Sequence, residues 1–241
     1  MSRLHISTRG IGSWRERLAS PDRHWRRERS AFETAVSWEW AALRRRPSQL
    51  PEPIERLFLA GGFGDPTLLI AVAEHQVELA GRGNDSHCDV WGLVGTTVGT
   101  VSLSVEAKAQ ERFGNETLQE FLTGGTSPGS PANRQARWTD IEGHLPTPAT
   151  GDYLNIRYQL LHRCATAVIE ARRLRLRHAA FVVQAFGSPP ERADEFTAFC
   201  AVMGITPRPQ TLTPVNVNDV RLDVGWADCP FATDQQVAAV A

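Results

Sequence analysis

The chain has 241 residues, of which 41% are hydrophobic and 22% charged, so it can bury the core of one large globular domain. Its formal net charge of -1 argues against a protein that coats polyanions over its whole surface. No apolar run is long enough to cross a bilayer, and the first twenty residues lack the apolar core of a signal peptide, so we expect a cytoplasmic protein without membrane contact.

The N-terminal part is rich in Trp and Arg and predicts one or two helices over residues 13–46, where apolar residues recur at helical spacing. A further helix follows Pro53 and ends at the glycine-rich turn 61–64. We expect residues 1–50 to be a helical extension and residues 51–241 to form the main body of a single domain.

Three strands with short turns are predicted next, over residues 74–79, 89–94 and 100–107, and they would form an antiparallel meander. A short helix at 116–122 and a Gly/Ser/Pro-rich loop at 124–131 follow, while residues 132–152 carry no clear pattern. Residues 153–175 predict a helix, 179–186 a strand buried on both faces, 192–202 a helix and 220–226 a strand. This order predicts an α/β fold in which helices flank a mixed central sheet.

One residue stands apart in composition. Of the 26 basic residues, 25 are Arg, and the only lysine is Lys108, in the sequence Val-Glu-Ala-Lys. A bias that replaced lysine elsewhere would be expected to replace this one too, unless arginine fails at the position. Arginine fails where a compact ammonium must approach a reacting water or a phosphate oxygen, because its planar group is larger and its charge more diffuse.

The neighbours of this lysine support a site. Glu106 and Lys108 are two residues apart in a predicted strand, so both side chains leave the sheet on the same side. Asp89 begins the preceding predicted strand, and strand pairing can bring its carboxylate beside Glu106. Two carboxylates and the Ala107 carbonyl offer the oxygen ligands that Mg²⁺ prefers, and Mn²⁺ could substitute.

This arrangement resembles the PD-(D/E)XK phosphodiesterase superfamily, which includes the type II restriction endonucleases, over residues 54–186. The sequence is also similar to an uncharacterised bacterial family that shares this core, especially over residues 105–114 and 157–170. Cys88 stands where the superfamily motif has a proline. The resemblance implies a restriction-endonuclease-like core and a Mg²⁺-dependent nuclease acting on DNA rather than RNA, in a defence or restriction context, with a homodimer as one way to cut both strands.

The resemblance also implies roles for individual residues. Asp89, Glu106 and the Ala107 carbonyl would hold the metal, while Lys108 would orient the attacking water and stabilise developing negative charge. Glu74 and Glu39 are candidates for an additional acidic ligand, with Glu74 slightly ahead, and Gln159 is a candidate contact from the following helix. The residues expected to grip the nucleic-acid backbone are Arg163, Arg172, Arg173 and Arg175.

Other readings of the same residues stay open. Glu106 and Lys108 could form an exposed charge pair, and the arginines near residues 163–175 could be a solvated helix face. An alternative function is therefore a catalytically inactive nuclease-like fold that binds nucleic acid or a protein. The four cysteines show no spacing typical of zinc sites or disulfides, and no phosphate-binding loop follows the glycines at 61–64.

Overall fold

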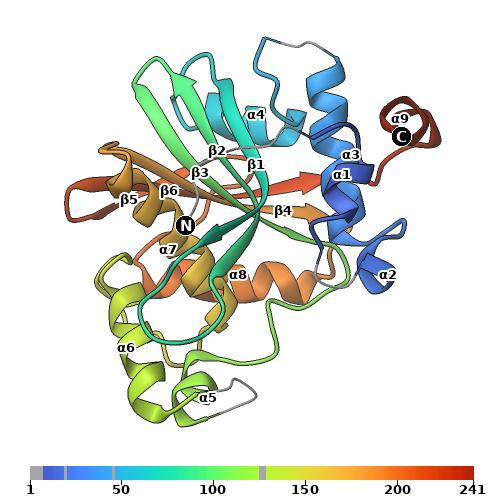
Figure 1. Cartoon of the computed structure of the whole chain (residues 1–241). Coiled ribbons are helices and arrows are strands. Elements are labelled where there is room, and N and C mark those ends of the chain that lie inside the picture. Colours follow the sequence, from blue (N-terminus) through green and yellow to red (C-terminus); the bar gives the residue numbers. More distant parts are fainter. Residues whose placement is uncertain (1–7, 19–20, 45–46, 125–128) are drawn as a thin grey trace.

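The structure is a computed structural model that describes residues 8–18, 21–44, 47–124 and 129–241. Its middle layer is a six-stranded sheet with the strand order β1-β2-β3-β4-β6-β5 (Figure 1). The strands are β1 (Thr67–Val77), β2 (Ser86–Thr96), β3 (Gly99–Lys108), β4 (His178–Phe186), β5 (Thr213–Val217) and β6 (Val220–Cys229). β1 to β3 form an antiparallel meander, β3, β4 and β6 are parallel, and β5 is antiparallel to β6. The predicted α/β class, the mixed sheet and the meander are thus confirmed.

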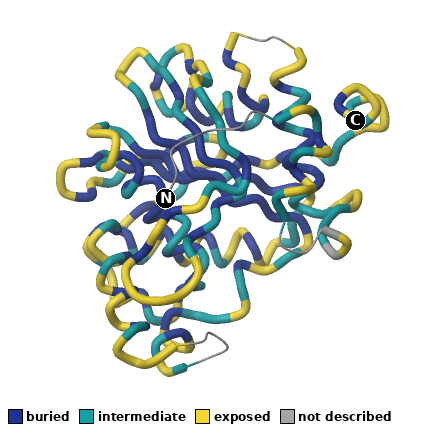
Figure 2. Tube along the Cα trace, viewed as in Figure 1, coloured by how far each residue is buried: buried dark blue, intermediate teal, exposed yellow. Residues whose placement is uncertain are grey.

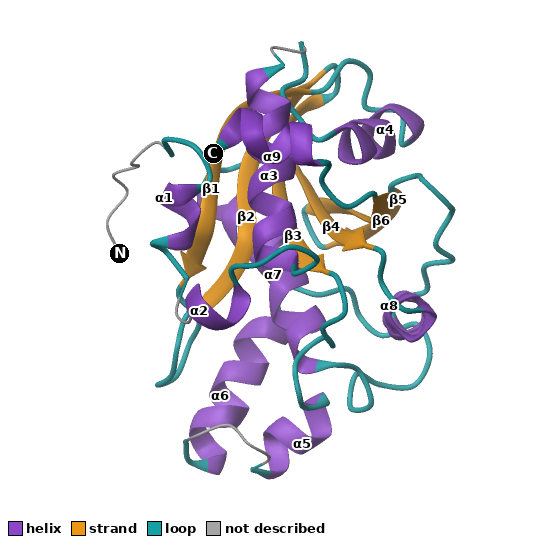
Figure 3. Cartoon of the chain, turned by 90° about the vertical axis from the view of Figure 1, so that its right-hand side faces the viewer, coloured by secondary structure: helices purple, strands orange, loops and turns teal. Residues whose placement is uncertain are grey.

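Helices cover both faces of the sheet (Figures 1 and 3). On one face lie α1 (Gly12–Arg15), α2 (Pro21–His24), α3 (Ser30–Leu43), α4 (Glu52–Ala60) and α9 (Asp234–Val240). On the other lie α5 (Leu118–Thr123), α6 (Pro131–Glu142), α7 (Tyr158–Arg173) and α8 (Pro190–Val202). The strands between the two layers are the most buried part of the chain (Figure 2).

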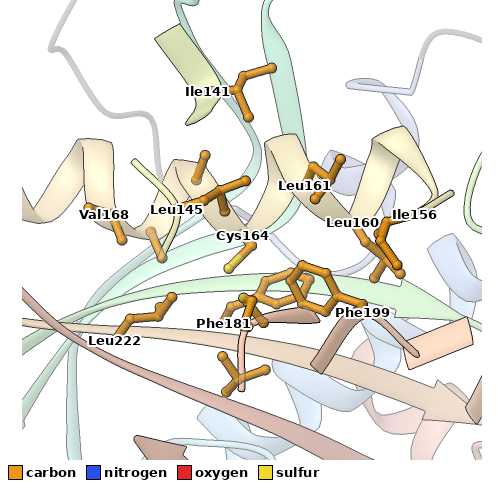
Figure 4. Packing of buried hydrophobic residues seen from close by; sticks show 14 of the residues in the cluster. Ile141, Leu145, Ile156, Leu160, Leu161, Cys164, Val168, Phe181, Phe199 and Leu222 are labelled. Atoms are coloured by element: carbon orange, nitrogen blue, oxygen red, sulfur yellow. The ribbon is translucent and has the colours of Figure 1, made fainter. Parts of the chain in front are cut away.

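α7 connects β3 to β4 and packs along the sheet by an apolar stripe. Leu160, Leu161, Cys164 and Val168 are all fully buried and contribute to the core shared with the sheet residue Phe181 (Figure 4). Leu160 and Leu161 lie four and three residues before Cys164, and Val168 lies four residues after it, which places all of them on one side of a helix. This packing fixes the helix against β3 and β4, and it also fixes the polar residues that α7 carries beside the stripe.

The N-terminal helices share a core with the sheet. Phe32, Val36 and Trp38 of α3 belong to the same buried cluster as Val90 of β2 and Leu103 of β3. The segment predicted as an extension therefore packs directly on the sheet. In the described part of the chain, no helix has the length and apolarity needed to cross a membrane.

Several boundaries differ from the predictions. The described residues of the stretch 13–46 form three helices. β1 begins at Thr67 rather than at residue 74, because this edge strand mixes exposed and buried positions along its length. α7 begins at Tyr158, since Arg157 instead pairs with Thr117 in an isolated bridge. β5, α6 and α9 were not predicted, and the loop predicted at 124–131 lies partly outside the described residues.

Candidate active site where β2 and β3 separate

The proposed site begins where regular pairing between β2 and β3 stops. The ladder runs from Thr96 and Gly99 to Val90 and Val105, which is the last pair recorded between these two strands. Beyond it, the backbone N–H of Ala107 donates to Oδ2 of Asp89 at 2.6 Å. A side-chain carboxylate therefore takes the place of a backbone carbonyl. Because the N–H and C=O of a strand residue point to the same side, the Ala107 carbonyl also faces the gap that Asp89 fills.

Glu106 and Lys108 leave β3 on the α7 side, as their spacing predicts. Lys108 Nζ donates to Glu106 Oε1 at 2.5 Å, and Arg163 Nε of α7 donates to Glu106 Oε2 at 2.8 Å. The side chains of Glu106 and Lys108 are only 2% and 7% exposed. Ala107, between them, joins the core on the opposite face. The exposed charge pair considered from the sequence is thus wrong, since this pair is buried.

Arg163 of α7 is held by contacts to both β2 and β3. Its backbone carbonyl accepts a hydrogen bond from Ser104 Oγ at 3.0 Å, and its Nη1 donates to Ser86 Oγ at 3.3 Å. Its side chain is 12% exposed. The sequence predicts Arg163 as a contact to the nucleic-acid backbone, and the structure places it inside the carboxylate cluster, as the partner of Glu106.

Glu74 lies across from Asp89 and interrupts β1. The ladder pairs Ala73 with Val90 and His75 with Cys88, so Glu74 stands at the level of Asp89, and it has a left-handed backbone with φ of +52°. Ala73 packs in the core beneath α3, whereas His75 stacks on Trp91 and reaches Glu170 of α7. Residues two apart in a regular strand share a face. The left-handed residue therefore reverses which side chains of β1 face α3 and which face α7, and this reversal occurs at the level of Asp89.

Burial and neighbouring negative charge raise the pKa of two carboxylates in this cluster, Asp89 and Glu74. Burial, reinforced by the negative charge of Glu106, raises the pKa of Asp89 to about 7. Burial and the charge of Asp89 raise the pKa of Glu74 to about 8. Lys108 and Arg163 oppose the shift at Asp89. Carboxylates with such shifts in a geometric cluster are candidates for a functional site, because the burial and like charge that shift their pKa are also the conditions found around catalytic groups.

The loop after β3 covers Lys108. The Lys108 ammonium lies 5.5 Å from the centre of the Phe113 ring, in a cation–π geometry. Glu111 accepts hydrogen bonds from the backbone of Ala109 and Ser30, which ties this loop to the start of α3. The ammonium is therefore enclosed by a carboxylate on one side and an aromatic ring on another.

Gln159 lies one helical turn before Arg163, beside Gly114. Its Oε1 atom is buried and has no hydrogen-bond partner among the described residues. Among the described residues, Gln159 makes no hydrogen bond to Asp89 or Glu106. The structure thus places this predicted residue on the same face of α7 as Arg163, without joining it to the carboxylates.

The remaining predicted residues lie elsewhere. Glu39 accepts a hydrogen bond from Trp14 Nε1 at 2.8 Å, on the α3 side of the sheet. Arg172 donates to the Gly143 carbonyl at 2.9 Å and contacts His144, Arg173 pairs with Glu170, and Arg175 is exposed. The last three arginines begin nine residues beyond Arg163, about 13 Å along the helix axis.

The sequence also missed residues of the cluster. Ser86 contacts His162 Nδ1 at 2.8 Å and Thr166 Oγ1 at 3.1 Å, and burial lowers the pKa of His162 well below its ordinary value. Arg17 donates to the Ala73 carbonyl at 3.3 Å. These contacts join residues 56 or more positions apart, so no local pattern signals them.

Two surface cavities, of about 290 and 480 Å³, lie on the α3 side, and neither is lined by Asp89, Glu106 or Lys108. Among the described residues, no group of three or more His, Cys, Asp or Glu side chains is arranged to hold a metal ion. Any cation at the candidate site would therefore need oxygen ligands from the backbone, water or substrate in addition to the side chains as they stand.

Comparison with known proteins gives one match. A family model described as a domain of unknown function (DUF6946) matches residues 7–230. No curated protein and no solved structure matches the chain.

Proposed function

We propose that this chain, which belongs to the family described as a domain of unknown function (DUF6946), is a divalent-metal-dependent phosphodiesterase that hydrolyses nucleic acid. The observation that carries the proposal is the bond between Asp89 and the Ala107 amide, which brings a carboxylate from β2 against the Glu-Ala-Lys segment of β3. The lysine of that segment, Lys108, is the only lysine of the chain. DNA is the substrate that the resemblance to PD-(D/E)XK enzymes implies.

The available oxygen atoms fit Mg²⁺ or Mn²⁺. Mg²⁺ keeps several waters and is commonly bound by one or two carboxylates together with substrate phosphate, so it does not need three protein side chains. Asp89, Glu106 and the Ala107 carbonyl would hold it, and Glu74 is favoured over Glu39 as an additional ligand because it lies level with Asp89. A cation here would also offset the two effects that raise the pKa of Asp89, which are burial and the negative charge of Glu106.

The roles of the protein groups follow from their contacts. When bound, the metal ion would stabilise negative charge on the phosphate and assist ionisation of the attacking water. Lys108, held by Glu106 and Phe113, would place its ammonium beside that water and the developing charge. Arg163 would keep Glu106 in one orientation. Once a cation neutralises Glu106, the guanidinium of Arg163 would be free to turn toward a phosphate of the substrate.

The arrangement of elements supports the same proposal. α4, the β1–β3 meander, α7 and β4 follow one another in the order that the resemblance implies, with β4 parallel to β3. The candidate residues gather at the end of β3 and at the start of α7, where β2 and β3 separate. A restriction-endonuclease-like core is therefore part of the proposal.

One observation favours the alternative of a catalytically inactive binding module. Both carboxylate oxygens of Glu106 already accept hydrogen bonds from cations, and such a closed set of pairs can serve stability alone. The two functions differ in the response to metal. An inactive module needs no divalent cation, whereas the phosphodiesterase loses all activity without one.

The deciding experiment incubates the purified full-length chain with plasmid DNA, single-stranded DNA and RNA, each with Mg²⁺, Mn²⁺ or EDTA. We expect cleavage that EDTA abolishes and that Asp89→Asn loses. Asp228→Asn is the matched control, because Asp228 is an exposed carboxylate at the end of β6, bonded to Trp226. Binding of nucleic acid without cleavage under all metal conditions would favour the inactive module.

A further inference from the structure

Arg17 reaches the candidate site from the N-terminal segment that follows α1. Its Nη1 donates to the Ala73 carbonyl at 3.3 Å, across 56 residues of sequence. That carbonyl belongs to the same planar peptide group as the backbone nitrogen of Glu74. The hydrogen bond therefore restrains the orientation of the peptide group that precedes Glu74. Glu74 itself has a left-handed backbone conformation, with φ of +52°.

We propose that Arg17 is a positioning residue of the metal site: by holding the Ala73–Glu74 peptide group, it keeps Glu74 level with Asp89, from where its carboxylate joins an arriving cation as an additional acidic ligand. This inference rests on the proposed function, because it assumes that a divalent cation binds at Asp89. It adds a residue from the N-terminal segment to a site otherwise built from the sheet and α7.

The conformation of Glu74 needs such support. A left-handed backbone is unfavourable for a residue with a side chain, because its Cβ comes too close to the following carbonyl oxygen, and it persists only where the surroundings hold it. β1 is an edge strand, so only β2 pairs with it, and its other edge is open to groups from outside the sheet. Arg17 occupies that edge at the peptide group next to Glu74.

Arg17 is itself well placed to act as a fixed donor. Its backbone N–H donates to the Trp14 carbonyl at 3.0 Å, and Trp14 is buried, with its indole N–H bonded to Glu39. Ile11, three residues before Trp14, donates to the Val240 carbonyl at 3.1 Å. The segment that carries Arg17 is thus attached to both α3 and the C-terminal helix, and it lies beside β1 (Figure 3).

A purely electrostatic role of Arg17 and a positioning role predict opposite changes in metal affinity when Arg17 is removed. The positive charge of Arg17 lies close enough to lower the pKa of Glu74 against the effect of burial. If charge were its whole contribution, removing Arg17 would remove repulsion of an incoming cation and tighten metal binding. If Arg17 positions a ligand, removing it weakens metal binding, and residues that hold a metal ligand in place are worth about 10–100-fold in affinity.

The test measures Mn²⁺ affinity by calorimetry in the full-length wild type, Arg17→Ala, Glu74→Gln and the double variant, without nucleic acid. Arg15→Ala is the matched control, since Arg15 lies on the same segment but pairs with the exposed Asp22. We expect Arg17→Ala and Glu74→Gln each to lose about tenfold, the double variant to lose no more than either alone, and Arg15→Ala to match wild type.

Unchanged or tighter Mn²⁺ binding by Arg17→Ala overturns the inference, as does a full additional loss in the Glu74→Gln background. If Arg17→Ala does not fold, Arg17→Lys replaces it, and wild-type affinity in that variant also overturns the inference. A wild type that neither binds Mn²⁺ nor cleaves nucleic acid contradicts the proposed function itself. A wild type that binds Mn²⁺ while the Arg17 variants match it contradicts only the role of Arg17.

Discussion

The Oδ2 atom of Asp89 lies 2.6 Å from the backbone nitrogen of Ala107. The carboxylate thus satisfies an amide that would otherwise pair with β2, while its negative charge adds to that of Glu106 close by. The hydrogen bond from Ala107 stabilises the Asp89 carboxylate at this position, whereas the negative charge of Glu106 destabilises it. Asparagine separates the two effects, because its side-chain oxygen can accept the same hydrogen bond without the charge.

Asp89→Asn should remove metal binding without harming the fold. We expect Mn²⁺ affinity to fall at least about tenfold, because a neutral amide is a weaker ligand than a carboxylate. In EDTA the variant should be more stable than wild type at pH 8 by roughly 1–3 kcal/mol, since it removes a poorly compensated, partly buried charge. Calorimetry and urea unfolding measure the two effects, with Asp228→Asn as the control. Wild-type Mn²⁺ affinity would show that Asp89 is not a ligand.

Lys108→Arg should lose most hydrolysis although it keeps the charge. The ammonium is enclosed by Glu106 and Phe113, and its side chain is only 7% exposed, so the larger guanidinium cannot occupy the same position. We expect kcat to fall by about 10²–10³ in Lys108→Arg and in Lys108→Ala. Substrate affinity is measured in parallel, and it should change much less than kcat. Equal cleavage by wild type and Lys108→Arg would refute the placement of this lysine.

The metal-free chain should lose stability as pH rises. Folding raises the pKa of Asp89 to about 7 and that of Glu74 to about 8, so the folded state binds protons that the unfolded chain has released. The loss of unfolding free energy caused by these two carboxylates is absent below about pH 4, where they are protonated in both the folded and the unfolded state. It is complete above about pH 8, where they are ionised in both states. Urea unfolding in EDTA from pH 4.5 to 8.5 should show a steeper decline for wild type than for Asp89→Asn. Parallel declines would contradict the shift at Asp89.

The left-handed backbone of Glu74 predicts an unusual preference for glycine. Glu74→Gly should be more stable than Glu74→Ala by about 1 kcal/mol, because glycine adopts a positive φ without steric cost. Glu78, exposed just after β1, is the control site, where alanine should be the more stable replacement. Thermal unfolding in EDTA of the glycine and alanine variants at positions 74 and 78 measures the stability difference at each site. A more stable Glu74→Ala would mean that residue 74 is not left-handed in solution.

Arg175 tests whether nucleic acid extends along α7. It is exposed, whereas Arg172 and Arg173 already have partners within the chain. If duplex phosphates reach this end of the helix, Arg175→Glu should weaken binding and reduce the slope of log K against log salt by about 1. Arg56→Glu, on the exposed side of α4, should leave both quantities unchanged. An unaltered salt slope for Arg175→Glu would assign this arginine to a solvated helix face.

The sequence by itself predicted the elements whose side-chain pattern is regular. β2, β3, β4 and α7 are continuously apolar on at least one side, so their type and order followed from periodicity, with ends a few residues from those observed. The shared face of Glu106 and Lys108 followed from the period of a strand. The single lysine marked the position without any knowledge of its neighbours.

The tertiary structure alone decided which charges meet at that position. Arg163 was predicted as a contact for nucleic acid, and only the packing of α7 on the sheet makes it the partner of Glu106. The choice of Glu74 over Glu39, and the approach of Arg17, depend on a left-handed residue that breaks the alternation of β1 and on a contact across 56 residues. Periodicity describes neither, because a local pattern assumes a regular backbone and carries no record of which distant side chain fills the edge of a strand.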